Sequence, residues 1–329
     1  MKKLLILLAA LYISSQFSAV YASVLDREDV RQFITEMSTR HGFDVDGLDA
    51  IFRKVEFSDS VIAAISRPAE TLPWHKYRPI FLGPARIQMG VDFWRRHRDS
   101  LQRAQAQFGV PPEVLVAIIG VETRYGKDKG KYPVIDSLST LAFGYPQRSS
   151  FFRSELEQYL LLTREQGFDP LSLKGSYAGA MGIPQFISSS YRNYAVDFDH
   201  DGVIDIWNSM DDAIGSIANY FKLHGWQPGG QVAIPAVVKS DKYKQLVSDD
   251  LKPVNTIAEL RSYDIMPSTA LSPETLSRFL VLEDSNGSEF WLGFENFYVI
   301  TRYNTSPLYA MAVYQLAGEI KSRYTHGTN

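Results

Sequence analysis

A glutamate at the end of an apolar run is the residue whose setting most clearly suits acid–base chemistry. In the stretch VLVAIIGVETRYG, seven of the eight residues before Glu122 are Val, Leu, Ala or Ile, and Gly126 follows shortly after it. An apolar setting disfavours the charged form of a carboxylic acid, so the group keeps its proton to a higher pH. A general acid that protonates a leaving oxygen needs that property. The pattern alone also allows a surface glutamate at a frayed helix end.

A second candidate is the small-residue segment GSYAGAMGIPQF, residues 175–186. So many small residues in succession indicate a close approach of the backbone, either to another element or to a ligand. Ser176 and Gln185 are polar side chains within the segment that can hydrogen-bond a sugar or the acid. The alternative interpretation is a tight helix-packing motif.

An acidic segment, DFDHDGVIDIWN (residues 197–208), has the spacing of an EF-hand-like calcium loop at most positions. Four acids within nine residues repel one another unless a cation is present. The segment therefore predicts a structural calcium ion, or another cation, and the alternative is a solvated acidic turn. Positions one, three, five, six, seven (through its carbonyl) and nine are Asp197, Asp199, Asp201, Gly202, Val203 and Asp205.

The ligand that would close this loop is left open by the spacing. Position twelve is Asn208, where calcium loops of this kind carry a bidentate glutamate. A carboxylate slightly further along the chain, Asp212 or Asp211, is able to complete the shell. Asn208 itself would give weaker binding, because an amide oxygen carries no charge.

Helices are predicted wherever apolar residues recur three and four positions apart. The first such face is formed by Val30, Phe33, Ile34 and Met37, and Gly42 stops it. Prolines are predicted to break the chain over residues 70–82. The predicted helical segments are 23–43, 44–57, 60–68, a long one over 85–109, one that Pro111 and Pro112 open and that carries Glu122, and then 149–167, 209–226 and 306–324.

Two segments are predicted to be strands, GGQVAIPAVV (residues 229–238) and FYVITRYN (residues 297–304). From Gln227 to about Phe294 the sequence is polar, proline-interrupted and mixed in its signals, which indicates a small accessory domain. The closing helix follows, with Ser306 as its cap and Pro307 at its first position.

The first 22 residues have the features of a signal peptide. Lys2 and Lys3 precede the apolar stretch LLILLAALYI, and a cleavage site is expected after Ala22; an uncleaved anchor is the alternative. No other long apolar run follows, so the mature chain is expected to be soluble and without a transmembrane segment. The absence of cysteine excludes disulfides, thiolate metal sites, a cysteine nucleophile and a lipid-modified cysteine. No basic stripe occurs, which argues against nucleic acid as a partner.

Five blocks in one order give the chain a family resemblance. They are VAIIGVETRYG, YPQRSSFFRSELEQYLLLTRE, GSYAGAMGIPQFISSSYRNYAVDFDHDG, DAIGSIANYFKLHGW and VITRYN. From about Ile34 to the C-terminus the sequence resembles the lytic murein transglycosylase B family, a lysozyme-like group that acts on peptidoglycan. Any one block alone would be weak, and their common order makes the match specific.

The resemblance implies a mainly α (α+β) fold. It would comprise a mainly helical N-terminal domain (residues 23–100), a lysozyme-like catalytic core (101–226), the small β-containing domain (227–294) and a return to the core (295–329). The best-known members carry a lipid-modified cysteine after the signal, which this chain lacks. A soluble periplasmic form is therefore expected.

The resemblance also implies residue roles. Glu122 matches the single catalytic acid of the family, and Ser176 matches the serine near that acid. The acid that closes the calcium loop aligns best with Asp212. No cofactor is implied for catalysis. Residues that match positions lining the sugar groove are Gln185, Tyr220, Tyr303, Asn304 and Tyr309, with Tyr77 and Arg148 as further positions.

The reaction implied is cleavage of the MurNAc-β-1,4-GlcNAc bond of peptidoglycan to give 1,6-anhydro ends, with one glutamate as acid and then base. A second carboxylate is not needed, unlike in the usual two-acid scheme. Peptidoglycan strands are the expected partner, and other cell-wall enzymes are candidate partners. The alternatives are a hydrolytic muramidase of the same fold, for which Asp128 is the nearest second acid in sequence, and a non-catalytic peptidoglycan-binding scaffold.

Overall fold

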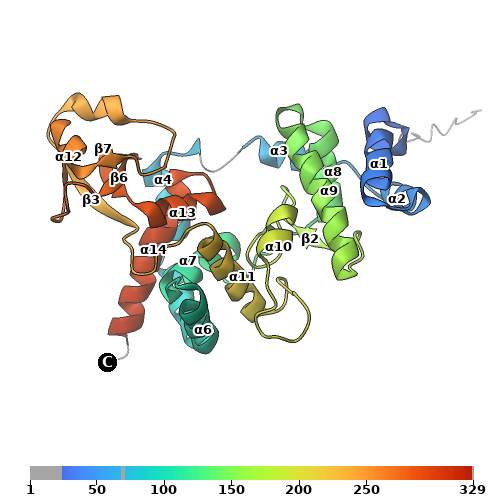
Figure 1. Cartoon of the computed structure of the whole chain (residues 1–329), viewed down its shortest axis with the longest axis horizontal. Coiled ribbons are helices and arrows are strands. Elements are labelled where there is room, and N and C mark those ends of the chain that lie inside the picture. The colour runs from blue at the N-terminus through green and yellow to red at the C-terminus, as the bar shows by residue number, and fades with distance from the viewer. Residues whose placement is uncertain (1–23, 68–70, 328–329) are drawn as a thin grey trace, which may run out of the picture. The chain divides into compact units, whose positions relative to one another are not determined.

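The computed structural model describes residues 24–67 and 71–327, in which helices predominate over strands (Figure 1). The chain divides into two compact units, the first ending at Lys54 and the second beginning at Val55. The predicted signal peptide lies outside the described residues. A mainly α fold with a small amount of β structure is the class that the sequence predicted.

The first unit is a helix pair that follows a short 3-10 turn, η1 (Val24–Asp26). Helix α1 (Glu28–His41) ends at Gly42, which takes the left-handed conformation with φ +67°, as the sequence predicted. Asp44 begins helix α2 (Val45–Phe52) by accepting a hydrogen bond from the amide of Gly47. The rings of Phe33 and Phe52 meet edge to face, with centroids 6.0 Å apart, and so join the two helices.

The second unit holds the other helices and all the described strands. No single helix among the described residues has the length and composition to cross a membrane. The two helices Arg98–Phe108 and Pro112–Thr123 reach that length and composition only when taken together, and they are bent by 114° at their junction. The helices are α3 (Asp59–Ile65), α4 (Trp74–Phe81), α5 (Pro84–Arg96), α6 (Arg98–Phe108), α7 (Pro112–Thr123), α8 (Val134–Gly144), α9 (Ser149–Gln166), α10 (Ser188–Tyr194), α11 (Met210–Leu223), α12 (Ile257–Ser262), α13 (Glu295–Tyr303) and α14 (Pro307–His326), with the 3-10 turns η3 (Pro146–Arg148) and η4 (Asp241–Leu246).

Helix α7 is the core element of this unit, and it packs against α5, α6, α11 and α14. Every residue from Val114 to Gly120 is buried. A helix that is apolar all round must be covered on every side, which is why four helices surround it. Gly120 permits one close approach, because a Cβ there would lie 2.7 Å from the ring of Tyr125.

The small domain contains a five-stranded antiparallel sheet with strand order β4-β6-β7-β3-β5. Its apolar face covers α12 and a cluster that includes Ile234, Phe279 and Leu292. The strands lie within the segment that the sequence assigned to a β-containing domain. They are β3 (Ala233–Val238), β4 (Asn255–Thr256), β5 (Ile265–Pro267), β6 (Leu276–Asp284) and β7 (Gly287–Gly293).

A second, two-stranded sheet joins the loop after Glu122 to the small-residue segment of residues 175–186, which we call the Gly-rich segment. It pairs β1 (Tyr132–Pro133) with β2 (Lys174–Gly175), and Tyr132 lies opposite Gly175. Segments about forty residues apart in the sequence are thereby held side by side.

Three local predictions are wrong. Residues 297–304, predicted as a strand, form most of α13, because Phe297, Ile300 and Thr301 bury one helical face and this packing outweighs the strand propensity of Val and Ile. The long helix over 85–109 is two helices, α5 and α6, which meet at His97. Residues 74–81, expected to be broken by prolines, form α4 with Pro79 inside it.

The predicted start of α14 and the predicted end of α9 are confirmed. Ser306 caps α14 by accepting the amide of Tyr309, and Pro307 is its first residue. Gly167 ends α9 in the left-handed conformation, with φ +68°. Helix α14 brings Tyr309 into the second unit's core beside α7.

Candidate active site

Glu122 lies in the last turn of α7, where the buried helix ends and the chain reverses. Arg124, Tyr125 and Gly126 follow with φ of +49°, +63° and +82°, so three successive left-handed residues turn the backbone sharply. The amide of Tyr125 closes the turn on the carbonyl of Ile119 at 3.1 Å. The carboxylate is thus half-buried at the end of a rigid helix rather than on a frayed one.

The hydroxyl of Tyr309 donates a hydrogen bond to Oε1 of Glu122 at 2.5 Å. Tyr309 is 3% exposed, and burial together with the nearby charge of Glu122 raises its pKa well above the usual value of a phenol. Tyr77 of α4 lies close enough to add to that effect. Tyr309 therefore remains a protonated donor throughout the physiological pH range and fixes one carboxylate oxygen.

Tyr303 is a second tyrosine close to the acid. Its hydroxyl donates to the carbonyl of Pro184 at 2.5 Å, in the Gly-rich segment. Its pKa is also raised well above the usual value, first by burial and then by the charge of Glu122. The ring packs against Tyr220 at 4.9 Å and against Phe186 at 5.8 Å between centroids. Acid, tyrosines and Gly-rich segment therefore form one continuous site.

The Gly-rich segment is compact because its glycines admit a close approach of backbone, from a neighbouring element and from the segment itself. At Gly182, φ is +68° and a Cβ would lie 2.6 Å from the carbonyl oxygen of Ile206. At Gly175, a Cβ would lie 2.3 Å from the carbonyl oxygen of Ala180. Close packing to another element, one of the two interpretations offered by the sequence, thus accounts for Gly182, whereas Gly175 packs against the backbone of its own segment.

Ser176 holds the first turn of that segment. Its hydroxyl oxygen accepts the amides of Ala178 and Ala180, at 3.2 and 3.1 Å, and its own amide donates to the carbonyl of Ala180. Its backbone also packs against Gly130, in the loop that follows Glu122: a Cβ on Gly130 would lie 2.6 Å from the Ser176 nitrogen. Ser176 is therefore linked to the acid's loop through the backbone.

Gln185 ties the same segment to the loop after the acid. It has φ of +52°, and its side-chain nitrogen Nε2 donates to the carbonyls of Gly182 at 2.8 Å and Lys129 at 3.3 Å. Asn304 accepts the amide of Ser306 at 3.0 Å and shapes the turn between α13 and α14. Gln185 thus lies beside the loop after the acid, and Asn304 lies between the helices that carry Tyr303 and Tyr309.

Arg148 lies apart from this group. It is exposed at the start of α9, with its guanidinium 4.5 Å from the ring centre of Phe151 and 5.0 Å from that of Phe152. These two phenylalanines belong to α9 and not to the tyrosine cluster around Glu122. Its role in the groove stays a prediction.

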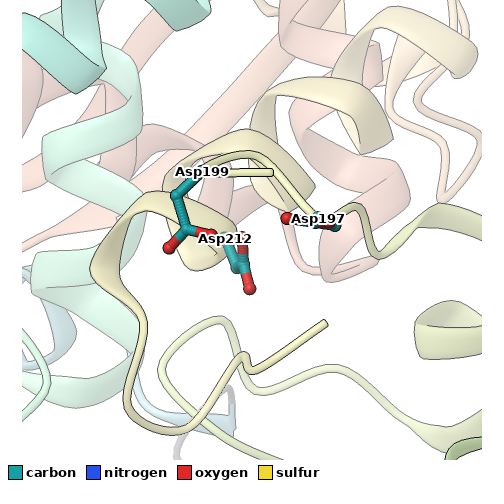
Figure 2. A group of neighbouring side chains, drawn as sticks. All are labelled: Asp197, Asp199 and Asp212. Carbon is teal, nitrogen blue, oxygen red and sulfur yellow. The ribbon is translucent and has the colours of Figure 1, made fainter. Parts of the chain in front are cut away.

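Three acids of the predicted metal loop come together (Figure 2). One carboxylate oxygen from each of Asp197, Asp199 and Asp212 lies within 4.8 Å of the others. Asp212 is 1% exposed, and burial raises its pKa. Its two oxygens accept the amides of Phe198 and Asp205, which fasten the loop to α11. Hard carboxylate oxygens in such a group suit a calcium ion.

The other predicted ligands are engaged in turns of the loop. Asp201 accepts the amide of Val203 at 2.8 Å, and Asp205 accepts the amides of Trp207 and Asn208, both at 2.9 Å. These carboxylates hold the loop's shape and lie outside the group of three.

Asp211, the other acid considered for closing the loop, is used elsewhere. It pairs with Arg103 and accepts the hydroxyl of Ser100, both at 2.5 Å. The geometry thus favours Asp212 as the closing residue over Asp211.

Two residues that position the acid were not found from the sequence. Thr123 is fully buried, and its hydroxyl donates to the carbonyl of Ile183, which ties the end of α7 to the Gly-rich segment. The hydroxyl of Tyr125 donates to the carbonyl of Arg86 at 2.8 Å. A polar residue directly beside a buried helix was the available signal for Thr123, but its partner lies 60 residues away.

Known proteins resemble the chain over most of its length. The model of the transglycosylase SLT domain matches residues 26–318. Membrane-bound lytic murein transglycosylase B of Escherichia coli (strain K12) is 44% identical over 298 residues, covering 88% of this chain and 81% of the relative.

Two solved structures share the fold. The soluble lytic transglycosylase SltB1 from Pseudomonas aeruginosa is 50% identical, with a TM-score of 0.84, and the match covers 90% of this chain and 99% of that one. The Escherichia coli lytic transglycosylase Slt35, solved in complex with calcium, is 43% identical, with a TM-score of 0.83 and coverage of 91% and 95%. Because these matches extend over most of its length, the chain belongs to the lytic murein transglycosylase B family.

Proposed function

We propose that this chain is a lytic transglycosylase that cleaves the MurNAc-β-1,4-GlcNAc bonds of peptidoglycan, with Glu122 as acid and then base. The family gives the reaction class. The observation that supports the assignment of the acid is the hydrogen bond from Tyr309, which fixes Glu122 at the end of a buried helix beside the tyrosine cluster. A carboxyl group held in this way can meet the same substrate atom in every cycle.

In the first step, protonated Glu122 gives its proton to the oxygen between MurNAc C1 and the next GlcNAc, and the C1–O bond breaks. The acetamido group of the substrate stabilises C1 after the leaving sugar departs. In the second step, the Glu122 carboxylate takes the proton of the MurNAc C6 hydroxyl, and that oxygen bonds to C1. Glu122 ends the cycle protonated, the product is a 1,6-anhydro sugar, and no water is consumed.

The other site residues would act by position. Tyr303, which is half-buried, would offer its ring to a sugar. Tyr220, which is 6% exposed, would hold the ring of Tyr303 in place, and Gln185 and Asn304 would shape the backbone around them. Ser176 would keep the Gly-rich segment close to the acid. Tyr77 would support Tyr309 from behind, and Arg148 would act further along the glycan strand.

A hydrolytic muramidase would need a second carboxylate or a residue that holds water opposite Glu122. Asp128 was the nearest candidate in sequence. It is exposed, and its carboxylate pairs with Arg124 at 3.3 Å. This arrangement favours the transglycosylase reaction.

The test is a digestion of purified sacculi, with the product ends identified by mass spectrometry. Anhydro ends, which are lighter by one water than reducing ends, are expected. Glu122→Gln should lower the rate by about 10²–10⁴-fold while leaving the melting temperature and glycan binding in place, because one acid serves both steps. Reducing ends would establish the hydrolase instead. Wild-type protein that binds sacculi without releasing products would be a scaffold.

A calcium ion at Asp197, Asp199 and Asp212 is part of the same proposal. Its role would be structural, because the loop lies between the Gly-rich segment and α11, which carries Tyr220. The relative Slt35 was solved in complex with calcium. When bound, the ion would offset the mutual repulsion of these carboxylates.

We further propose that the chain is exported to the periplasm and works there on peptidoglycan strands. The basic start at Lys2 and Lys3 with its apolar stretch supports export, and the lack of cysteine excludes a lipid anchor of the thioether type. The curated relative, by contrast, is described as membrane-bound. N-terminal sequencing of protein from a periplasmic fraction tests the site of cleavage, which is expected after Ala22.

A further inference from the structure

A hollow of about 110 Å³ adjoins the candidate active site on the side of Tyr303. Tyr303 borders both the hollow and Glu122, whose charge acts on its hydroxyl. Of the described residues that line this space, only Arg302 carries a charge. The lining residues are Gln185, Phe186, Ile187, Ser190, Tyr220, Arg302 and Tyr303.

Arg302 is held rigidly but is not neutralised. Its guanidinium lies 4.1 Å from the ring centre of Tyr298, and Nη2 donates to the hydroxyl of Thr301 at 3.0 Å. Its Nε is buried without a hydrogen-bond partner. Among the described residues no acid forms an ion pair with it, so most of the five N–H donors of the guanidinium lack a protein partner.

An arginine on another element near the hollow has, by contrast, a counter-ion within the protein. Arg192, on the neighbouring helix α10, forms a two-pronged ion pair with Glu165, with contacts of 2.9 and 2.7 Å. A partly desolvated cation without a counter-ion is costly for the folded protein. Its position beside a substrate groove indicates that the counter-ion comes with the substrate.

We propose that Arg302 binds a carboxylate of the glycan substrate in this hollow and gives the enzyme a preference for anionic strands. This inference rests on the proposed function of the same site. Peptidoglycan offers such a group either in its stem peptide or, where the peptide has been removed, in the lactyl ether of MurNAc. A planar guanidinium stacked on a tyrosine is pre-organised to bind a carboxylate with two hydrogen bonds.

The experiment pairs two enzymes with two substrates. The substrates are soluble peptidoglycan strands and the same strands with their carboxylates converted to amides. Wild type should show a kcat/KM at least about tenfold higher on the anionic strands, mainly through KM, since a hydrogen bond to a charged group is worth about that factor. Arg302→Gln should lose this preference and turn over both substrates at about the wild-type rate for amidated strands.

Two variants complete the design. Arg302→Lys keeps the positive charge but loses the planar pair of N–H donors, and it should retain part of the preference for anionic strands. Arg192→Gln removes an arginine that Glu165 already neutralises, and it should keep the whole preference. Equal loss by Arg302→Gln on both substrates would overturn the proposal, because that result describes a purely structural role. Wild type that does not distinguish the substrates would also overturn it, even if the variant failed to fold.

A third substrate shows whether the lactyl carboxylate also serves as the ligand. Strands stripped of peptide by an amidase keep only the lactyl carboxylate, which is tied up in an amide bond while the peptide is present. If Arg302 dependence survives on them, the hollow accepts the lactyl carboxylate as well as that of the stem peptide, and if it is lost, only the stem peptide is bound. Failure of the proposed function would look different, since wild type would then give no anhydro ends on any of the three substrates.

Discussion

The hydrogen bond from Tyr309 to Glu122 joins two residues that lie 187 positions apart. A buried phenol with a raised pKa donates its proton in a hydrogen bond without releasing it, so it can fix a carboxyl oxygen in both protonation states of the acid. That property suits the role proposed for Glu122, which is to act first as acid and then as base.

Tyr309→Phe removes this donor and keeps the ring. We expect kcat to fall by about tenfold or more, with a small change in KM, because the loss affects the geometry of the transition state. Steady-state kinetics on soluble peptidoglycan strands measure it. Tyr159→Phe is the matched control, since it removes a buried hydroxyl of α9 that donates to the carbonyl of Pro170. Equal rates for Tyr309→Phe and wild type would contradict the role.

Ser176→Ala should act on both stability and turnover. The hydroxyl accepts the amides of Ala178 and Ala180, and alanine leaves them without that partner at a cost of about 1–3 kcal/mol. A lower melting temperature and a kcat that falls more than KM rises are expected. Ser172→Ala, at an exposed serine of the preceding turn, is the control. A variant with wild-type kcat would remove Ser176 from the site.

At the scale of elements, periodicity predicted most helices because their buried faces repeat every three to four residues. Periodicity failed where the position or type of an element depends on something other than the spacing of apolar residues. The apolar spacing runs on through His97, yet the backbone bends there and α5 and α6 separate. In residues 297–304 the β-branched residues predicted a strand, and only the packing of α13 in the folded chain shows why a helix forms.

Gly130, which packs against the Gly-rich segment, and Gly167, which ends α9, allow the cost of lost close packing to be separated from the cost of backbone strain. Gly130 has φ of +89°, and a Cβ there would lie 2.1 Å from the carbonyl of Gly175, whereas Gly167 has φ of +68° with nothing within 4 Å. Gly167→Ala should cost about 1 kcal/mol for strain alone. Gly130→Ala should cost clearly more and also lower activity, because the loop after Glu122 must shift. Urea unfolding of both variants checks this, and equal costs would mean that the close approach is unimportant.

At the scale of the whole molecule, the sequence alone predicted a helical chain with a small β segment, and the resemblance supplied the arrangement. The hydroxyl of Thr123 reaches Ile183, and that of Tyr303 reaches Pro184, across distances in sequence that no local pattern encodes. The acidic loop was predictable because its spacing is local. The spacing left Asp211 and Asp212 open as the closing acid, because they are adjacent in sequence, and the resemblance favoured Asp212. In the structure Asp212 is the one that lies with Asp197 and Asp199.

The predicted metal loop links α11 to the Gly-rich segment, since Asp212 accepts the amide of Asp205 and the carbonyl of Ile206 accepts the amide of Ile183. A ligand that binds only the folded state stabilises it by about 2.7 kcal/mol at a hundredfold excess over Kd. We therefore expect a chelator to lower the melting temperature by several degrees, and millimolar calcium to restore it.

Two neighbouring acids show whether that response comes from the group of three. Asp199→Asn keeps the shape of an exposed ligand but removes its charge, and it should abolish the calcium response. Asp211→Asn breaks the pair with Arg103 instead, and so it should lower the melting temperature in chelator and in calcium alike while keeping the difference between them. If wild type melts at the same temperature in both solutions, the loop is an acidic turn held by its own hydrogen bonds. If Asp211→Asn is the variant that loses the response, then Asp211 and not Asp212 closes the shell, and the loop must rearrange around the ion to let it turn away from Arg103.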